Sequence, residues 1–111
     1  MVGHAANVRR LLDIAPDSVA VPGVEVRNLT ETEDLELKVI DMEPGQSTPF
    51  HTHPHAHEAV IVSGVGALRL DGREEALGPG DVLFVNPGEP HAIANRGSTG
   101  LRFVCLDCRV G

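Results

Sequence analysis

The chain has 111 residues and a formal net charge of −7, and it contains no Trp or Tyr. This length suits one domain with a single hydrophobic core. The acidic charge and the scarcity of aromatic side chains argue against a surface that reads phosphates or stacks on bases. We therefore expect no nucleic-acid partner.

The first 20 residues are predicted to be an N-terminal extension of the domain. The charged residues Arg9, Arg10 and Asp13 interrupt any apolar run, so we predict neither a signal peptide nor a membrane span. Spacing typical of a helix occurs only over Ala5–Ile14, and Pro16 ends it. We accordingly expect a cytoplasmic protein with no membrane partner.

The rest of the chain, about residues 22–108, alternates between short apolar runs and turn residues. Each run is rich in Val, Leu and Ile and has the length of a strand. The predicted strands cover residues 24–27, 35–42, 59–62, 67–70, 82–85, 91–94 and 101–106. Asp71-Gly72 is the strongest hairpin signal and predicts a type I′ turn. These short strands without crossover helices predict an all-β antiparallel sandwich or barrel, in a single domain over residues 1–111.

The two cysteines have the spacing of a C-x-x-C pair, but they lie in an apolar, strand-like run. Residues three apart in a strand face opposite sides of the sheet. We therefore predict two unpaired thiols, with Cys105 facing inward and Cys108 outward.

Four of the six histidines lie in the stretch HTHPHAH, which a glutamate follows. A strand through His51 and His53 would place both imidazoles on one face, about 7 Å apart, where they can converge on one ion. Pro54 interrupts this strand. Another strand starts at His57 and Glu58, and only one of these two neighbours can point to the interior.

The spacing of these residues resembles the two sequence motifs of the cupin family. The first motif is matched by Gly45, His51, His53 and Gly64. The second motif is matched by Gly80, Gly88, His91 and Asn95. The second departs from the pattern at one place, because Asn86 stands in the proline position and Pro87 follows it. The resemblance covers about residues 35–106 and implies an antiparallel jelly-roll barrel with a metal near its mouth.

The first motif also decides between His57 and Glu58. Six residues separate the third ligand from the motif glycine, and this spacing selects His57, which leaves His55 in a bend and Glu58 outside. The stretch HTHPHAHE further resembles small single-domain cupins that hold manganese with four histidines. The implied metal ligands are His51, His53, His57 and His91. We expect one divalent ion, manganese or iron, with copper, nickel and zinc as alternatives.

The same resemblance implies which other side chains line the pocket. Carried over position by position, it gives Lys38, Thr48, Phe103 and Cys105. Lys38 would either hold an anionic group of the substrate or be a surface lysine, and the sequence leaves both open. Asn95 is expected to orient the backbone near the site.

Six-coordinate geometry with four histidines would leave two adjacent positions on the ion. Such positions on a redox-capable metal favour a dioxygenase-type oxidoreductase that acts on a small organic molecule. The alternatives are a non-redox isomerase, decarboxylase or lyase, and a non-catalytic module that binds a small ligand. The resemblance also implies a homodimer.

Overall fold

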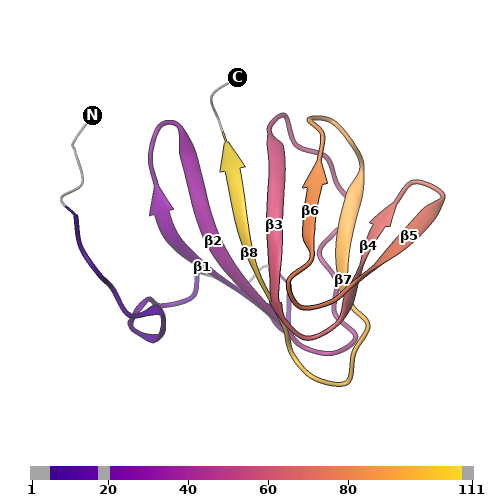
Figure 1. Ribbon diagram of the computed structural model, residues 1–111, viewed down its shortest axis with the longest axis horizontal. Coiled ribbons are helices and arrows are strands. Elements are labelled where there is room, and N and C mark those ends of the chain that lie inside the picture. Colours follow the sequence, from indigo (N-terminus) through magenta and orange to yellow (C-terminus); the bar gives the residue numbers. More distant parts are fainter. Residues whose placement is uncertain (1–5, 18–20, 109–111) are drawn as a thin grey trace.

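The computed structural model describes residues 6–17 and 21–108, which fold into two antiparallel sheets (Figure 1). The larger sheet has the strand order β1-β2-β8-β3-β6, and the smaller has the order β5-β4-β7. The strands are β1 (Val24–Glu31), β2 (Leu35–Met42), β3 (Ala56–Ser63), β4 (Gly66–Leu70), β5 (Arg73–Leu77), β6 (Val82–Val85), β7 (His91–Asn95) and β8 (Leu101–Cys108). This arrangement confirms the all-β antiparallel jelly-roll prediction.

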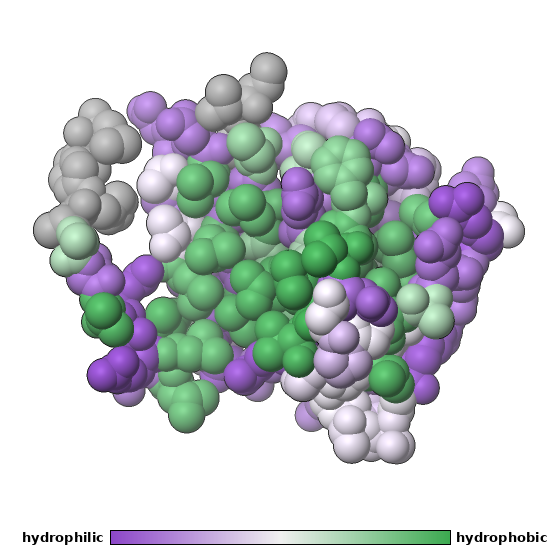
Figure 2. Space-filling view, in the orientation of Figure 1, coloured by the Kyte–Doolittle hydropathy of each residue, from purple (hydrophilic) through white to green (hydrophobic). Residues whose placement is uncertain are grey.

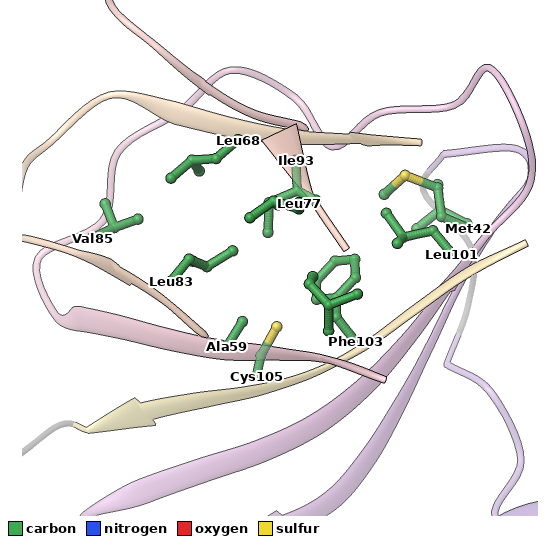
Figure 3. Packing of buried hydrophobic residues seen from close by; sticks show 12 residues of the cluster. Met42, Ala59, Leu68, Leu77, Leu83, Val85, Ile93, Leu101, Phe103 and Cys105 are labelled. Carbon is green, nitrogen blue, oxygen red and sulfur yellow. The ribbon is translucent and has the colours of Figure 1, made fainter. Parts of the chain in front are cut away.

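Side chains that point inward from both sheets form the core (Figure 3). Alternation along β8 puts Leu101, Phe103 and Cys105 in the interior, each at most 1% exposed. The prediction for the cysteines is confirmed, because Cys105 is buried, Cys108 is exposed and neither forms a disulfide. Met42 packs beside Leu101 at one end of the barrel, and this leaves the other end for polar side chains.

The N-terminal segment differs from the predicted helix over Ala5–Ile14. Ala5 lies outside the described residues, and the rest of the segment contains only a 3₁₀ turn, η1 (Leu11–Asp13). A helix this short is marginal unless it buries an apolar face. Leu12 is 81% exposed, so that burial is missing. No helix in the described part of the chain is long and apolar enough to cross a membrane.

The predicted hairpin at Asp71-Gly72 joins β4 to β5, but its turn is not of type I′. Type I′ needs a positive φ at both central residues. Gly72 has a φ of 78°, whereas no described residue other than glycine has a positive φ. A side chain at Asp71 disfavours the left-handed region, so only the glycine adopts it. A negative φ followed by a positive one is the pattern of a type II turn.

The predicted strand through His51 and His53 is wrong. His51 forms an isolated bridge with His91, and residues 52–55 are irregular. Pro54 lacks an N–H group and so cannot complete a ladder there. The backbone carbonyl of His53 instead accepts a hydrogen bond from Gly88 N at 2.9 Å. His53 is therefore held by the loop that precedes β7.

Candidate metal centre

Four histidine side chains meet at the polar end of the barrel, and they come from three parts of the fold. His91 begins β7, and the backbones of His51 and His91 exchange two hydrogen bonds of 3.0 Å. His57 lies on β3 of the larger sheet, and His53 lies in the irregular segment before it. The ring centroids of neighbouring imidazoles are 4.8–5.7 Å apart.

The Nδ1 atoms of all four imidazoles are occupied. The Nδ1 atom of His51 donates to the backbone carbonyl of Pro49 at 2.5 Å. That of His53 donates to the carbonyl of His55 at 3.0 Å, and that of His91 donates to the carbonyl of Glu89 at 2.8 Å. The Nδ1 atom of His57 donates to Asp107 Oδ1 at 2.8 Å. A carbonyl oxygen can only accept, so the proton of each neutral ring resides on Nδ1. The Nε2 lone pairs therefore remain available for a metal ion.

His57 provides the observation that tests whether these residues fit a metal. Its Nε2 atom is buried and has no hydrogen-bond partner. An unsatisfied buried polar atom costs about 1–3 kcal/mol. A divalent ion among the imidazoles would satisfy this atom, and imidazole nitrogen is a suitable ligand for such ions. His51, His53 and His91 already offer ligand atoms within 4.8 Å of one another.

Asp107 also belongs to a group of potential ligands, together with His53 and His57. One of its carboxylate oxygens already accepts the His57 hydrogen bond, and the two residues are direct neighbours across β3 and β8. A carboxylate that holds a ligating histidine by its second nitrogen is common at metal sites. We therefore regard Asp107 as the residue that orients His57.

Burial sets the charge of two of the imidazoles. It lowers the pKa of His57, although the adjacent Asp107 carboxylate partly offsets this effect. Burial also lowers the pKa of His91, although the hydrogen bond to the Glu89 carbonyl acts in the opposite direction. Both rings are accordingly neutral at neutral pH, which is the form that binds metals.

The imidazoles line a cavity of about 170 Å³. The predicted pocket residues Lys38, Thr48, Phe103 and Cys105 all line it as well. Sequence reasoning missed Asp107, which also lines the cavity, although it is two residues beyond Cys105 on the same strand face. Ile40 and Ile93 complete the wall and make part of it apolar.

Lys38 reaches this cavity as one half of an ion pair. Its Nζ lies 2.5 Å from Glu36 Oε1, and its side chain is 27% exposed. Burial alone would lower the pKa of Lys38, but the hydrogen bond and charge of Glu36 and the charge of Asp107 together raise it. Lys38 therefore stays protonated at neutral pH.

The neighbouring residues that were expected to lie outside the site do so. His55 is half-buried in the bend, where its carbonyl holds His53. Glu58 is exposed on the outer face of β3. Asn95 does orient backbone, since its Nδ2 donates to the carbonyls of Met42 and Thr99 at 2.9 Å. It does so at the end of β7 opposite His91, however, and not near the site as expected.

A larger hollow of about 350 Å³ lies at the other end of the barrel. Its lining includes Gly23, Met42, Pro44 and Leu101, together with acidic side chains. Among the described residues, the groups that could hold a metal are all at the histidine end. The candidate metal centre is therefore at the smaller cavity.

Comparison with known proteins gives the family. The family model of the cupin domain matches residues 38–107, a range that contains all four clustered histidines. This chain belongs to the cupin family. Its jelly roll and both motif regions lie within or directly beside the matched range, so the family expected from the motifs is confirmed.

Three relatives illustrate what similar cupins do. The chain is 36% identical over 78 residues to an (R)-mandelonitrile lyase from Granulicella tundricola, a match of 69% of this chain and 49% of that protein. It is 32% identical over 89 residues to an oxalate-binding protein from Thermotoga maritima, covering 75% and 74%. The structure of the polyketide cyclase RemF from Streptomyces resistomycificus superposes with a TM-score of 0.85 at 26% identity, covering 94% and 80%. The chain thus spans only about half of the lyase.

Proposed function

We propose that this cupin is a metal-dependent enzyme that performs non-redox lyase-type chemistry on a small carbonyl, hydroxy or carboxylate compound. The observation that supports the proposal most directly is the buried Nε2 of His57, which has no hydrogen-bond partner and lies beside three further imidazoles that line the same cavity. In the proposed site, the ligands are His51, His53, His57 and His91. A bound divalent ion would supply Lewis-acid polarisation of a substrate oxygen.

Lys38 would serve as the charged group that meets the substrate. Its raised pKa keeps it protonated, so it can hold a carboxylate or donate a proton to a developing oxyanion, but it cannot act as a general base at neutral pH. After donating a proton, the neutral amine would lie 2.5 Å from the Glu36 carboxylate. That neighbour favours the ammonium form, so Lys38 would regain its proton readily.

The cavity limits the size and polarity of the substrate. Its volume of about 170 Å³ is below the range of about 300–1,000 Å³ found for pockets that hold drug-sized ligands. Phe103, Ile40 and Ile93 provide apolar parts of its wall, and Lys38 and Asp107 provide charged parts. A molecule with one apolar and one anionic or carbonyl end would match both parts.

Oxidative chemistry, which the motifs favour at first, has less support than the lyase-type alternative. The relatives described above are a lyase, an oxalate-binding protein and a polyketide cyclase, and none of these names indicates an oxidation. The cavity thiol adds no redox partner, because burial raises the pKa of Cys105 to about 12 and keeps it protonated. Thiol oxidation follows thiolate character, so this group is poorly reactive.

The experiment uses metal-free protein reloaded separately with manganese, iron(II), zinc and copper. Each form is given mandelonitrile and oxalate, and product formation and oxygen uptake are recorded together. We expect turnover without oxygen uptake, and we expect Lys38→Met to lower it while metal content stays unchanged. Oxygen consumed in proportion to substrate would instead support a dioxygenase. A four-histidine manganese site would be supported if manganese gives the highest activity.

A binding module is the second candidate, and the similarity to the oxalate-binding protein favours it. Calorimetry with oxalate would show tight binding without product for every metal.

Metal content also tests the ligand set with a matched pair of neighbours. His57→Ala should lose the ion and Glu58→Ala should keep it, whereas the reverse result would refute the assignment of His57.

A further inference from the structure

A row of ionisable side chains crosses the larger sheet at the histidine end of the barrel. Glu36 on β2 pairs in register with Asp107 on β8, and Asp107 pairs with His57 on β3. Glu36 is buried, at 9% exposure. It shares the inner face of β2 with Lys38, which lies two residues further along the strand and lines the cavity. Two carboxylates are therefore direct neighbours beside the candidate metal centre, and like charges in this arrangement repel.

Lys38 is the cation that offsets this repulsion. Its Nζ atom lies 2.5 Å from Glu36 Oε1, and the charge of Asp107 also favours the ammonium form. Among the described residues that line the cavity, Lys38 is the one Lys or Arg side chain. One ammonium group therefore serves two carboxylates. Together, these three side chains leave the site with one net negative charge before any metal binds.

A divalent ion bound by neutral imidazoles would add two positive charges to this site. The loaded site would then carry one net positive charge, which a single negative charge on a ligand balances. The remaining lining of the cavity is uncharged, since it consists of apolar side chains, the Thr48 hydroxyl and the Cys105 thiol, which burial keeps protonated. A second negative charge on the ligand would lie in these surroundings without a counter-charge, and burying such a charge is costly.

The end of the sheet beside Glu36 is acidic as well. The turn that joins β1 to β2 carries Glu33 and Asp34, which are exposed, and the exposed Glu31 at the end of β1 pairs in register with Glu36. Figure 2 shows a hydrophobic area over the middle of the molecule and hydrophilic residues where Figure 1 shows this turn. Charges of one sign near a cavity repel ligands of the same sign over a distance. These side chains would thus disfavour a dianion more than a monoanion.

We propose that Glu36 determines the specificity of this site, because it neutralises Lys38 and so makes the metal-loaded cavity select ligands with one negative charge over dianions. The inference rests on the metal centre of the proposed function and narrows its substrate class. A monocarboxylate matches this charge, and so does a hydroxy or carbonyl compound that becomes a single oxyanion. Lys38 can still donate a hydrogen bond to such a ligand, since an ammonium group has three N–H donors.

The test measures how the charge of a ligand affects its binding to the metal-loaded protein. Glycolate and oxalate are similar in size and carry one and two negative charges, and calorimetry gives both dissociation constants. Glu36→Gln removes a charge but preserves the shape of the side chain, so it should raise the affinity for oxalate about tenfold more than the affinity for glycolate. Glu58→Gln is the matched control, because Glu58 is exposed on the outer face of β3, and it should leave the ratio of the two constants unchanged.

Lys38→Met gives a second arm that does not depend on the folding of the Glu36 variant. It removes the cation, so it should weaken the binding of oxalate about tenfold more than that of glycolate. Metal content is measured for each variant, so that loss of the ion is not mistaken for loss of affinity. A ratio that stays constant in both variants, or a native protein that binds neither probe, would overturn the inference. Turnover is not measured, so a protein without activity that shows both shifts would refute the proposed enzyme and leave the role of Glu36 intact.

Discussion

The four imidazoles of the candidate centre differ in what holds them. Three donate their Nδ1 protons to backbone carbonyls, and only His57 donates to a carboxylate, that of Asp107. A carbonyl fixes the ring, whereas a carboxylate also makes the imidazole a stronger ligand. Asp107 on β8 pairs with His57 on β3 on one side and with Glu36 on β2 on the other. One negative charge beside an otherwise neutral ligand set would partly offset the charge of a bound ion.

Replacing this carboxylate should weaken metal binding. Asp107→Asn keeps the size of the side chain but removes the charge, and partners of this kind contribute about 10–100-fold to metal affinity. Competition with a chromogenic chelator measures the dissociation constant. Asp41→Asn is the matched control, because Asp41 is an ion-paired carboxylate on the outer face of the same sheet. Equal loss of affinity in both variants would argue against a specific role for Asp107.

At the scale of elements, the segment before β3 behaves as an added strand beside β7. Ser47 and His51 form bridges with Ala94 and His91. Between them, Thr48 accepts a hydrogen bond from Ile93 N through Oγ1 at 2.9 Å, and its own N–H donates to the Ile93 carbonyl at 2.9 Å. This attachment carries His51 to its position next to His91. The Thr48 hydroxyl therefore supports the cavity in addition to lining it.

Removing this hydroxyl should loosen the segment. Thr48→Val preserves shape but leaves the N–H group of the buried Ile93 without its side-chain acceptor, which costs about 1–3 kcal/mol of unfolding free energy. Denaturant titration of the metal-free protein measures the loss. Thr48→Ser keeps the hydroxyl and should be the more stable of the two. A valine variant as stable as the serine variant would show that the hydrogen bond contributes nothing.

At the scale of the whole molecule, the candidate centre joins the two sheets at the end that the core leaves open. His57 belongs to the larger sheet, while His51 and His91 belong to the edge of the smaller one. At the opposite end, Leu101 belongs to the apolar core and Asn95 ties the backbones of Met42 and Thr99 together. A metal bound only by the folded chain would therefore act as a cross-link and stabilise the fold.

Metal should raise the melting temperature, and the gain should depend on pH. At 100 times the dissociation constant, binding contributes about 2.7 kcal/mol. His57 and His91 have lowered pKa values when folded, so the unfolded chain takes up protons first as the pH falls below about 6.5. Stability thus falls as pH decreases below that value, and protons also displace the metal. Melting curves with metal and with chelator should converge at acid pH; an unchanged gap would contradict this.

Much of this molecule could be predicted from local sequence. Period-two alternation and turn residues placed most strands, and Asp71-Gly72 placed a hairpin, because these features depend on neighbours along the chain. The same local rule failed for the turn type and for the strand through His51 and His53. The turn type depends on the positive φ of Gly72 alone. The backbone at His53 is held instead by a hydrogen bond from Gly88 N.

The sequence by itself determined the histidine spacing, the inward phase of Cys105 and the membership in a family of jelly-roll proteins. Only the tertiary structure decided which groups hold each imidazole, because the Nδ1 partner of His57 is 50 residues away in the chain. It alone also showed the buried Nε2 of His57 and the Glu36 partner of Lys38. The physical reason is that burial and pairing across strands depend on register between distant segments, which local periodicity does not contain.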